Sequence, residues 1–283
     1  MIPQSLLDQL HYVKVEDPAI DLHYFPNYLI VGPQRTGTTW LSYNLRFHPQ
    51  IMVTVPKEIF FFNRLNEPDH PYFQSDKLDW YLNFFQESPT SEAWNRKRLY
   101  SLMHFDEPYS PIMRGEATAS YATLDERVVR EIALLNPQVR IVFIIRNPID
   151  RAWSHAKMDF TQNRGRRIED ITKKEFEKFF NRPHQRKCAQ YTQNIDRWLS
   201  CIGKSSVFIG CFDDLQNRPV RFLLDVMTFL GVRSDKRYIH PGVNKVLNAT
   251  SPIQIPPDYR EMLKSLLRED MRNLEERFGV RWP

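Results

Sequence analysis

Two glycines, Gly32 and Gly37, enclose a four-residue loop between a short apolar run and the start of a helical pattern. Phosphate-binding loops have this spacing, because their backbone N–H groups and the positive end of the following helix converge on one anion. Arg35 adds a cation from inside the loop, and Thr38 and Thr39 add donors in the first helical turn. Thr38 stands where nucleotide-hydrolysing loops need Lys. The segment predicts a phosphate or sulfate site, with an ordinary strand-to-helix turn as the alternative.

Arg146 and Ser154 form a second candidate anion site. The apolar run 140–145 predicts a buried strand that ends at Arg146, and Pro148 suits the first turn of the helix that follows. A guanidinium at the strand tip and a hydroxyl two turns into that helix can converge on a phosphate. The alternative is an ion pair between Arg146 and Asp150, with Ser154 as an ordinary helix residue.

Glu58 is the first candidate for a general base. It follows Lys57 and precedes three phenylalanines, directly after a predicted strand. An aromatic wall keeps water from a carboxylate and a neighbouring cation holds it in reach, which suits proton abstraction. A surface ion pair beside a hydrophobic anchor is the alternative. His104 and His155 are rival bases that rank below Glu58.

The expected elements come from the apolar patterns. Runs bounded by polar turns predict strands over residues 28–31, 51–55, 112–115, 140–145 and 207–212. Helical patterns cover residues 39–47, 125–135, 148–160, 171–180, 189–201, 219–230 and 258–277. This alternation predicts a three-layer, P-loop-like α/β fold with a central, mainly parallel sheet flanked by helices. In such sheets ligands bind beyond the carboxyl ends of the strands, where both candidate anion sites lie.

No linker, repeat or low-complexity tract divides the 283 residues, so we expect a single domain over residues 1–283. The 39 Lys and Arg against 34 Asp and Glu residues, a formal net charge of +5, favour an anionic ligand but are too mixed for nucleic-acid binding. Cys188, Cys201 and Cys211 lack metal-ligand spacing, so we expect thiols in a reducing compartment, with one disulfide as the alternative. Residues 1–24 have neither a signal-peptide pattern nor an apolar run of about 18 residues. We therefore expect a cytoplasmic protein without stable membrane insertion, of undetermined oligomeric state.

Together these motifs resemble the sulfotransferases that use 3′-phosphoadenosine 5′-phosphosulfate (PAPS), most closely the heparan sulfate glucosaminyl N- and O-sulfotransferase group. The likeness runs in order from about Tyr28 to Trp282. It rests on Gly32-Pro-Gln-Arg-Thr-Gly-Thr-Thr, Glu58 with Phe61-Phe62, Asp79-Trp-Tyr-Leu-Asn-Phe-Phe85, and Arg146-Asn-Pro through Ser154. It implies sulfuryl transfer from PAPS, with the bisphosphate PAP as product and no metal requirement. The acceptor would be a hydroxyl or amine of a glycan or small molecule.

The resemblance also implies a set of nucleotide-binding residues: Arg35, Thr36, Gly37, Thr38, Thr39, Trp40, Arg146, Ser154, Asn244 and Lys245. The loop from Arg35 to Thr39 would hold the 5′-phosphosulfate, and Arg146 with Ser154 would hold the 3′-phosphate. Trp40 would stack on adenine, with a place in the core as the alternative. Asn244 and Lys245 would lie in a loop that closes over the nucleotide.

Glu58 and Arg35 are the implied catalytic residues of a single in-line displacement at sulfur. Glu58 would take the acceptor proton, and Arg35 would stabilise negative charge on the departing nucleotide. The family usually has Lys at position 35, and Arg cannot readily give up a proton, but it can still stabilise charge. Aromatic residues that could stack on an acceptor are Phe60, Tyr72, Trp80 and Trp153.

Two other functions stay open. An ATP-dependent small-molecule kinase could use the same scaffold, although the chain lacks the Gly-Lys-Ser/Thr ending of its loop. A nucleotide-binding regulator without catalysis is the second, and Arg35 is the feature that favours it.

Overall fold

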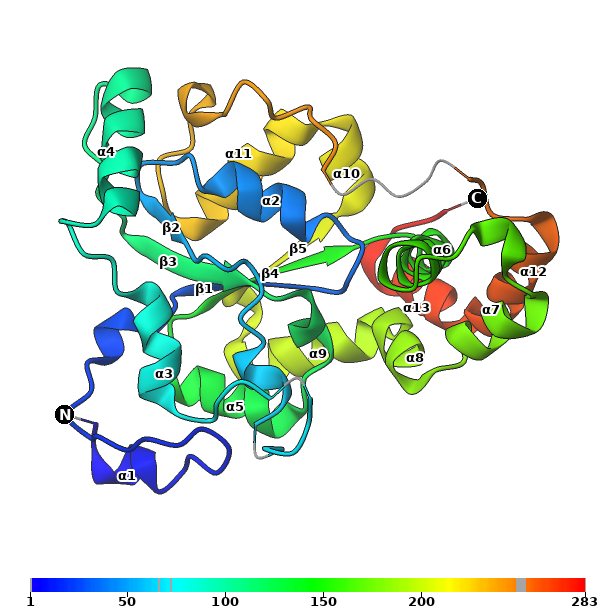
Figure 1. Ribbon diagram of the computed structural model, residues 1–283, viewed down its shortest axis with the longest axis horizontal. Helices are drawn as coiled ribbons and strands as arrows, with labels where there is room; N and C mark the ends of the chain where they lie inside the picture. The colour runs from blue at the N-terminus through cyan, green and yellow to red at the C-terminus, as the bar shows by residue number, and fades with distance from the viewer. Residues whose placement is uncertain (1, 66, 72, 248–252, 283) are drawn as a thin grey trace.

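The computed structural model describes residues 2–65, 67–71, 73–247 and 253–282, and a parallel sheet lies at its centre (Figure 1). Its strands are β1 (Tyr28–Gly32), β2 (Ile51–Val53), β3 (Met113–Ala117), β4 (Arg140–Ile145) and β5 (Val207–Cys211). Their order is β2-β3-β1-β4-β5, and every pairing is parallel. The prediction of an α/β fold around a parallel sheet is confirmed.

Helices surround this sheet and connect its strands. They are α1 (Gln4–Leu7), α2 (Thr38–Leu45), α3 (Leu78–Leu82), α4 (Glu92–Phe105), α5 (Glu126–Leu135), α6 (Pro148–Lys157), α7 (Lys173–Phe180), α8 (Pro183–Ala189), α9 (Tyr191–Ile202), α10 (Phe212–Asn217), α11 (Pro219–Leu230), α12 (Pro257–Leu266) and α13 (Arg268–Phe278). Figure 1 shows α2 and α11 over one face of the sheet and α5 and α9 over the other, which gives three layers. Because both faces are covered, β1 and β4 are nearly continuous apolar runs, and the sequence pattern predicted them well.

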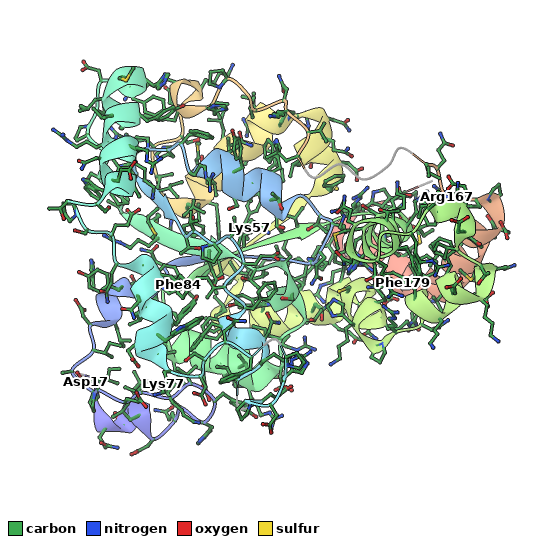
Figure 2. The ribbon with its side chains drawn as sticks, in the orientation of Figure 1. Asp17, Lys57, Lys77, Phe84, Arg167 and Phe179 are labelled. Atoms are coloured by element: carbon green, nitrogen blue, oxygen red, sulfur yellow. The ribbon has the colours of Figure 1, made fainter. Side chains whose placement is uncertain are left out.

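Helices α6, α7, α8 and α12 form a group of their own beyond the carboxyl ends of the strands (Figure 1). This group has a separate apolar core that includes Ile149, Phe176, Phe179 and Leu263. Figure 2 shows Phe179 inside the group and Arg167 at its outer edge. Asn147 caps the start of α6 by accepting the N–H of Ile149 at 2.9 Å, which fixes how this helix leaves β4.

Two strands end two residues away from the position that the sequence predicts, and β1 and β5 differ from it by one residue. The strand expected over 51–55 ends at Val53, because Val55 is 76% exposed and Pro56 has no N–H for the ladder. The strand expected over 112–115 runs instead from Met113 to Ala117. Glu116 lies buried within it, and a charged residue in a buried strand hides that strand from an apolar pattern.

The helix expected over 258–277 is two helices, α12 and α13, which meet at Leu267. Leu263 and Leu267 pack into the core of the α6 group, whereas Leu274 packs into the core under the sheet. Helix α11 has the predicted ends, the other predicted helices are present with shifted ends, and α6 continues as a π-helix over Met158–Asn163. Helices α1, α3, α4, α8 and α10 have no counterpart in the sequence prediction.

Candidate functional site

The glycine loop has the backbone of an anion cradle. Gly32 has φ 91° and Gly37 has φ 94°, values that side chains rarely tolerate, and a Cβ at Gly32 would clash with the backbone of Ala119. Arg35 is also left-handed, with φ 72°, a conformation that costs a residue with a side chain about 1–2 kcal/mol. Helix α2 starts at Thr38, directly after this loop. The loop therefore turns sharply between β1 and α2 through three residues with positive φ.

The two candidate anion sites meet in space. Arg35 Nε donates to Ser154 Oγ at 3.0 Å, and Arg146 Nη1 donates to the carbonyl oxygen of Arg35 at 2.7 Å. The guanidinium of Arg146 also lies 4.3 Å from the ring centre of Phe212, at the start of α10. The alternative ion pair between Arg146 and Asp150 is not formed, since Asp150 pairs with Arg260 at 3.3 Å.

Positive charge is concentrated at this junction. Burial, and then repulsion from Arg146, lowers the pKa of Arg35. Burial also lowers the pKa of Arg146. Lys157 joins them from the next turn of α6 after Ser154, and its pKa is lowered by burial and then by Arg146 and Arg35. Three partly desolvated cations that repel one another favour a bound anion. The sequence prediction missed Lys157, although its position three residues after Ser154 places it on the same face of the helix.

A cavity of about 200 Å³ opens at this junction. Its lining residues are Arg35, Gly37, Thr38, Thr39, Trp40, Arg146, Ser154, Phe212, Gln216, Val246 and Leu247. Phe212 and Gln216 come from α10, a helix that the sequence did not predict. A larger cavity of about 510 Å³ behind β5 contains none of the predicted site residues, so chemistry and not size identifies the candidate site.

Some predicted nucleotide-binding side chains do not face this cavity. The hydroxyl of Thr36 is buried and donates to the Pro33 carbonyl at 2.7 Å, which leaves only its backbone for a ligand. Asn244 and Lys245 do not line the cavity, and the next two residues, Val246 and Leu247, take their place. Trp40 packs in the core, 6% exposed, and donates from Nε1 to the Val243 carbonyl at 2.8 Å. It also lines the cavity, and its stacking on adenine stays a prediction.

Glu58 lies beside the glycine loop. Its Oε1 accepts from Lys57 Nζ at 2.9 Å and from the backbone N–H of Ala119 at 3.4 Å. Ala119 is the residue whose backbone packs against Gly32, so it connects the carboxylate to the loop. The side chain of Glu58 is 33% exposed.

Glu116, at the end of β3, holds the segment that carries Glu58. Its Oε2 accepts from Thr118 Oγ1 at 2.6 Å and from the N–H of Ile59 at 3.3 Å. Its Oε1 accepts from the hydroxyls of Tyr81 at 2.6 Å and Tyr121 at 3.1 Å. Burial raises the pKa of Glu116, and these four donors offset part of that rise. Four donors on two oxygens fit an ionised carboxylate, which fixes the backbone next to Glu58.

We expect Glu116→Gln to lower the free energy of unfolding by about 3 kcal/mol, because the amide NH₂ would face groups that donate to the carboxylate in the wild type. Turnover should also fall, since the backbone next to Glu58 loses this support. Urea unfolding and an activity assay measure the two effects. Glu131→Gln is the matched control, since buried Glu131 accepts three backbone N–H groups of the N-terminal segment, away from the cavity. It should destabilise the protein without affecting turnover. Equal turnover loss in both variants would contradict the role given to Glu116.

The rival bases are less suitable. His155 is buried, and burial followed by repulsion from Arg151 lowers its pKa to about 2. Its Nδ1 is already within 3.0 Å of Gln185 Nε2. His104 does not line the cavity, and its ring packs on Tyr100 with the centroids 4.2 Å apart.

Several remaining expectations concern cysteines, metals and aromatics. Cys188, Cys201 and Cys211 are free thiols, so the alternative of one disulfide is wrong. Among the described residues, no three His, Cys, Asp or Glu side chains gather into a metal site. In the same part of the chain, no helix combines the length and apolarity needed to cross a bilayer.

Two of the aromatic residues expected to stack on an acceptor can be judged further. Tyr72 lies outside the described residues. Trp153 is buried and donates to the Ile253 carbonyl, which makes it unsuited to stacking on an acceptor.

The chain matches a family model described as a sulfotransferase domain over residues 25–251. Among curated proteins it is similar to the bifunctional heparan sulfate N-deacetylase/N-sulfotransferase 1 of mouse, with 31% identity over 229 residues, and to that of human, with 30% identity over 229 residues. Each alignment covers 76% of this chain and 23% of the relative. The chain thus spans about a quarter of the length of these relatives.

Among solved structures, the chain is similar to a sulfotransferase from Alicyclobacillus acidocaldarius, with a TM-score of 0.62 and 25% identity. That alignment covers 91% of this chain and 97% of the other. The sulfotransferase domain of the Synechococcus PCC 7002 olefin synthase has a TM-score of 0.52 and 17% identity, over 91% of this chain and 96% of that one. The second likeness supports the fold alone.

Proposed function

The chain belongs to the sulfotransferase domain family, and from this premise we propose that it transfers a sulfuryl group from PAPS to a hydroxyl or amine. The proposal treats residues 1–283 as one catalytic domain, of which the family model covers residues 25–251. The three free thiols favour a reducing compartment, for which we propose the cytoplasm.

One observation carries the proposal: Arg35 of the glycine loop donates to Ser154 of the second motif, Arg146 donates to the Arg35 carbonyl, and all three residues line one cavity. PAPS has charged groups at both its 5′ and 3′ ends. The glycine loop would hold the 5′-phosphosulfate, and Arg146 with Ser154 would hold the 3′-phosphate. Lys157 does not line the cavity and donates to the Ile253 carbonyl at 3.1 Å, so it would add only its nearby charge. The cavity residues therefore fit this donor, and Trp40 and Phe212 supply apolar surface at the same place.

The mechanism that we propose is a single in-line displacement. The acceptor atom forms a bond to sulfur while the bond between sulfur and the bridging oxygen breaks, and the acceptor proton goes to Glu58. Arg35 stays protonated and stabilises the charge that develops on the leaving nucleotide. The N–H groups of the loop add to this stabilisation, and positioning supplies the rest, as in phosphoryl transfer.

For the acceptor we propose a glycan that contains glucosamine, or a smaller molecule with the same groups. The basis is the similarity to relatives whose names include heparan sulfate N-sulfotransferase. A chitosan oligosaccharide is a suitable first probe, since each of its sugars offers both an amine and hydroxyls.

A thermal unfolding experiment in EDTA tests the nucleotide site by comparing PAP with ATP at equal concentration. PAP at about 100 times its Kd should add about 2.7 kcal/mol. The midpoint should then rise by about 5–10 °C, and ATP should shift it less. A rise with ATP and Mg²⁺ but not with PAP would contradict the proposal and favour the kinase. PAP binding without transfer to any acceptor would favour the regulator.

A further inference from the structure

Helix α6 contains a second arginine, Arg151, which is completely buried between α6 and α8. Its Nη2 donates to Gln185 Oε1 at 3.2 Å, and its Nη1 lies 3.5 Å from Nδ1 of His155. Its Nε is buried and has no hydrogen-bond partner. Both acceptors are neutral, because Gln185 is an amide and the pKa of His155 is lowered to about 2 by burial and then by Arg151.

None of the ion pairs found among the described residues includes Arg151. A buried charge without a counter-ion is costly, and natural proteins normally pair such a charge or bind an ion beside it. The groups whose pKa it affects are His155, His184, Cys188, Tyr191 and Arg146. Burial is the largest cause of each of these shifts. Repulsion from Arg151 adds to the lowered pKa of His155, His184 and Arg146, and Arg151 opposes the raised pKa of Cys188 and Tyr191.

The position of Arg151 connects it to the candidate nucleotide site. It precedes Ser154 by one turn of α6, and its charge reaches Arg146. Ser154 and Arg146 both line the cavity, whereas Arg151 does not. Protein and not water fills the space around Arg151, so its field is poorly screened.

We propose that Arg151 is a buried counter-charge for the nucleotide, which strengthens binding of the anion at Arg146 and Ser154 without touching it. The inference rests on the proposed function. Gln185 would be the neutral partner that accepts one hydrogen bond from the guanidinium and leaves its charge uncompensated. The purely structural explanation is that Arg151 only joins α6 to α8 through its hydrogen bonds.

Gln185→Glu separates these two explanations, because it gives Arg151 a carboxylate partner at nearly unchanged shape. At pH 8, where imidazoles are mostly neutral, we expect PAP to bind about tenfold more weakly while the thermal midpoint is unchanged or higher. If Arg151 has only a structural role, Gln185→Glu should bind PAP as tightly as the wild type does, or more tightly. Isothermal titration with PAP and thermal unfolding give the two readouts on the full chain.

Two control variants make the test specific. Gln185→Met removes the amide but leaves the charge of Arg151, so the midpoint should fall while PAP affinity stays within about twofold. Gln138→Glu adds the same charge at an exposed position before β4, and should change neither readout. Arg151→Gln removes the charge directly and should weaken PAP binding as much as Gln185→Glu.

The outcomes distinguish the inference from the function. Unchanged PAP affinity in Gln185→Glu would overturn the inference and leave the proposed function standing. Equal loss of affinity in Gln185→Met and Gln185→Glu would also overturn it, in favour of the structural explanation. Absence of PAP binding by the wild-type chain would overturn both.

Discussion

Glu58→Gln is expected to lower sulfuryl transfer by about 10²–10⁴-fold while PAP affinity stays unchanged. The amide keeps the size of the side chain, and its oxygen can still accept from Ala119 and Lys57. It cannot take a proton from the acceptor. Glu58 does not line the cavity proposed for the nucleotide, so its loss should affect the chemical step alone.

Transfer from radiolabelled PAPS to a chitosan oligosaccharide measures this effect, and PAP titration measures binding. Glu92→Gln is the matched control, since Glu92 lies exposed on α4 in an ion pair with Arg96. Undiminished turnover in Glu58→Gln would exclude Glu58 as the base. Equal losses of turnover and PAP affinity would instead place it in nucleotide binding.

Arg146→Ala is expected to weaken PAP binding by about 100-fold, because it removes a partly buried cation from the proposed 3′-phosphate site. The same change removes the hydrogen bond from Nη1 to the Arg35 carbonyl. The left-handed backbone at Arg35 then loses a support, so transfer should fall as well. Arg146→Lys keeps the charge but not the planar fork, and should recover only part of the affinity.

Isothermal titration with PAP measures this loss. Arg221→Ala removes an equal charge from an exposed pair with Asp225 on α11, and should leave PAP affinity unchanged. Titration with adenosine 5′-phosphosulfate, which has no 3′-phosphate, shows whether the lost affinity comes from contact with the 3′-phosphate. If Arg146 contacts the 3′-phosphate, the variant should bind this compound almost as well as the wild type does. An equal loss with both nucleotides would contradict that assignment.

Much of this protein follows from short-range spacing in its sequence. Gly32 and Gly37 enclose a loop that only a few backbone shapes can close, and the apolar run 140–145 can be buried only as a central strand. These constraints act within about ten residues, so a single sequence is enough to read them. The parallel sheet, the glycine loop and the placement of Arg146 at a strand end all follow from such patterns.

The tertiary structure decided which side chains face the cavity. Thr36 follows Arg35 directly, yet its hydroxyl points inward, and Val246 and Leu247 line the cavity in place of Asn244 and Lys245. Side-chain direction depends on contacts made across the fold, such as the bond from Trp40 to the Val243 carbonyl. No local spacing encodes these directions.

The buried charges show most clearly what the tertiary structure decided. Glu116 accepts from Ile59 and Tyr81, which are distant in the sequence, and Arg151 finds a neutral partner in Gln185, 34 residues away. In the sequence, Glu116 interrupts an apolar pattern and Arg151 appears as one more polar helix residue. Their effect comes from desolvation, which exists only once the helices and the sheet enclose them. The sequence by itself therefore determined the fold class and indicated an anionic ligand, and the packed structure decided how far each charge is desolvated.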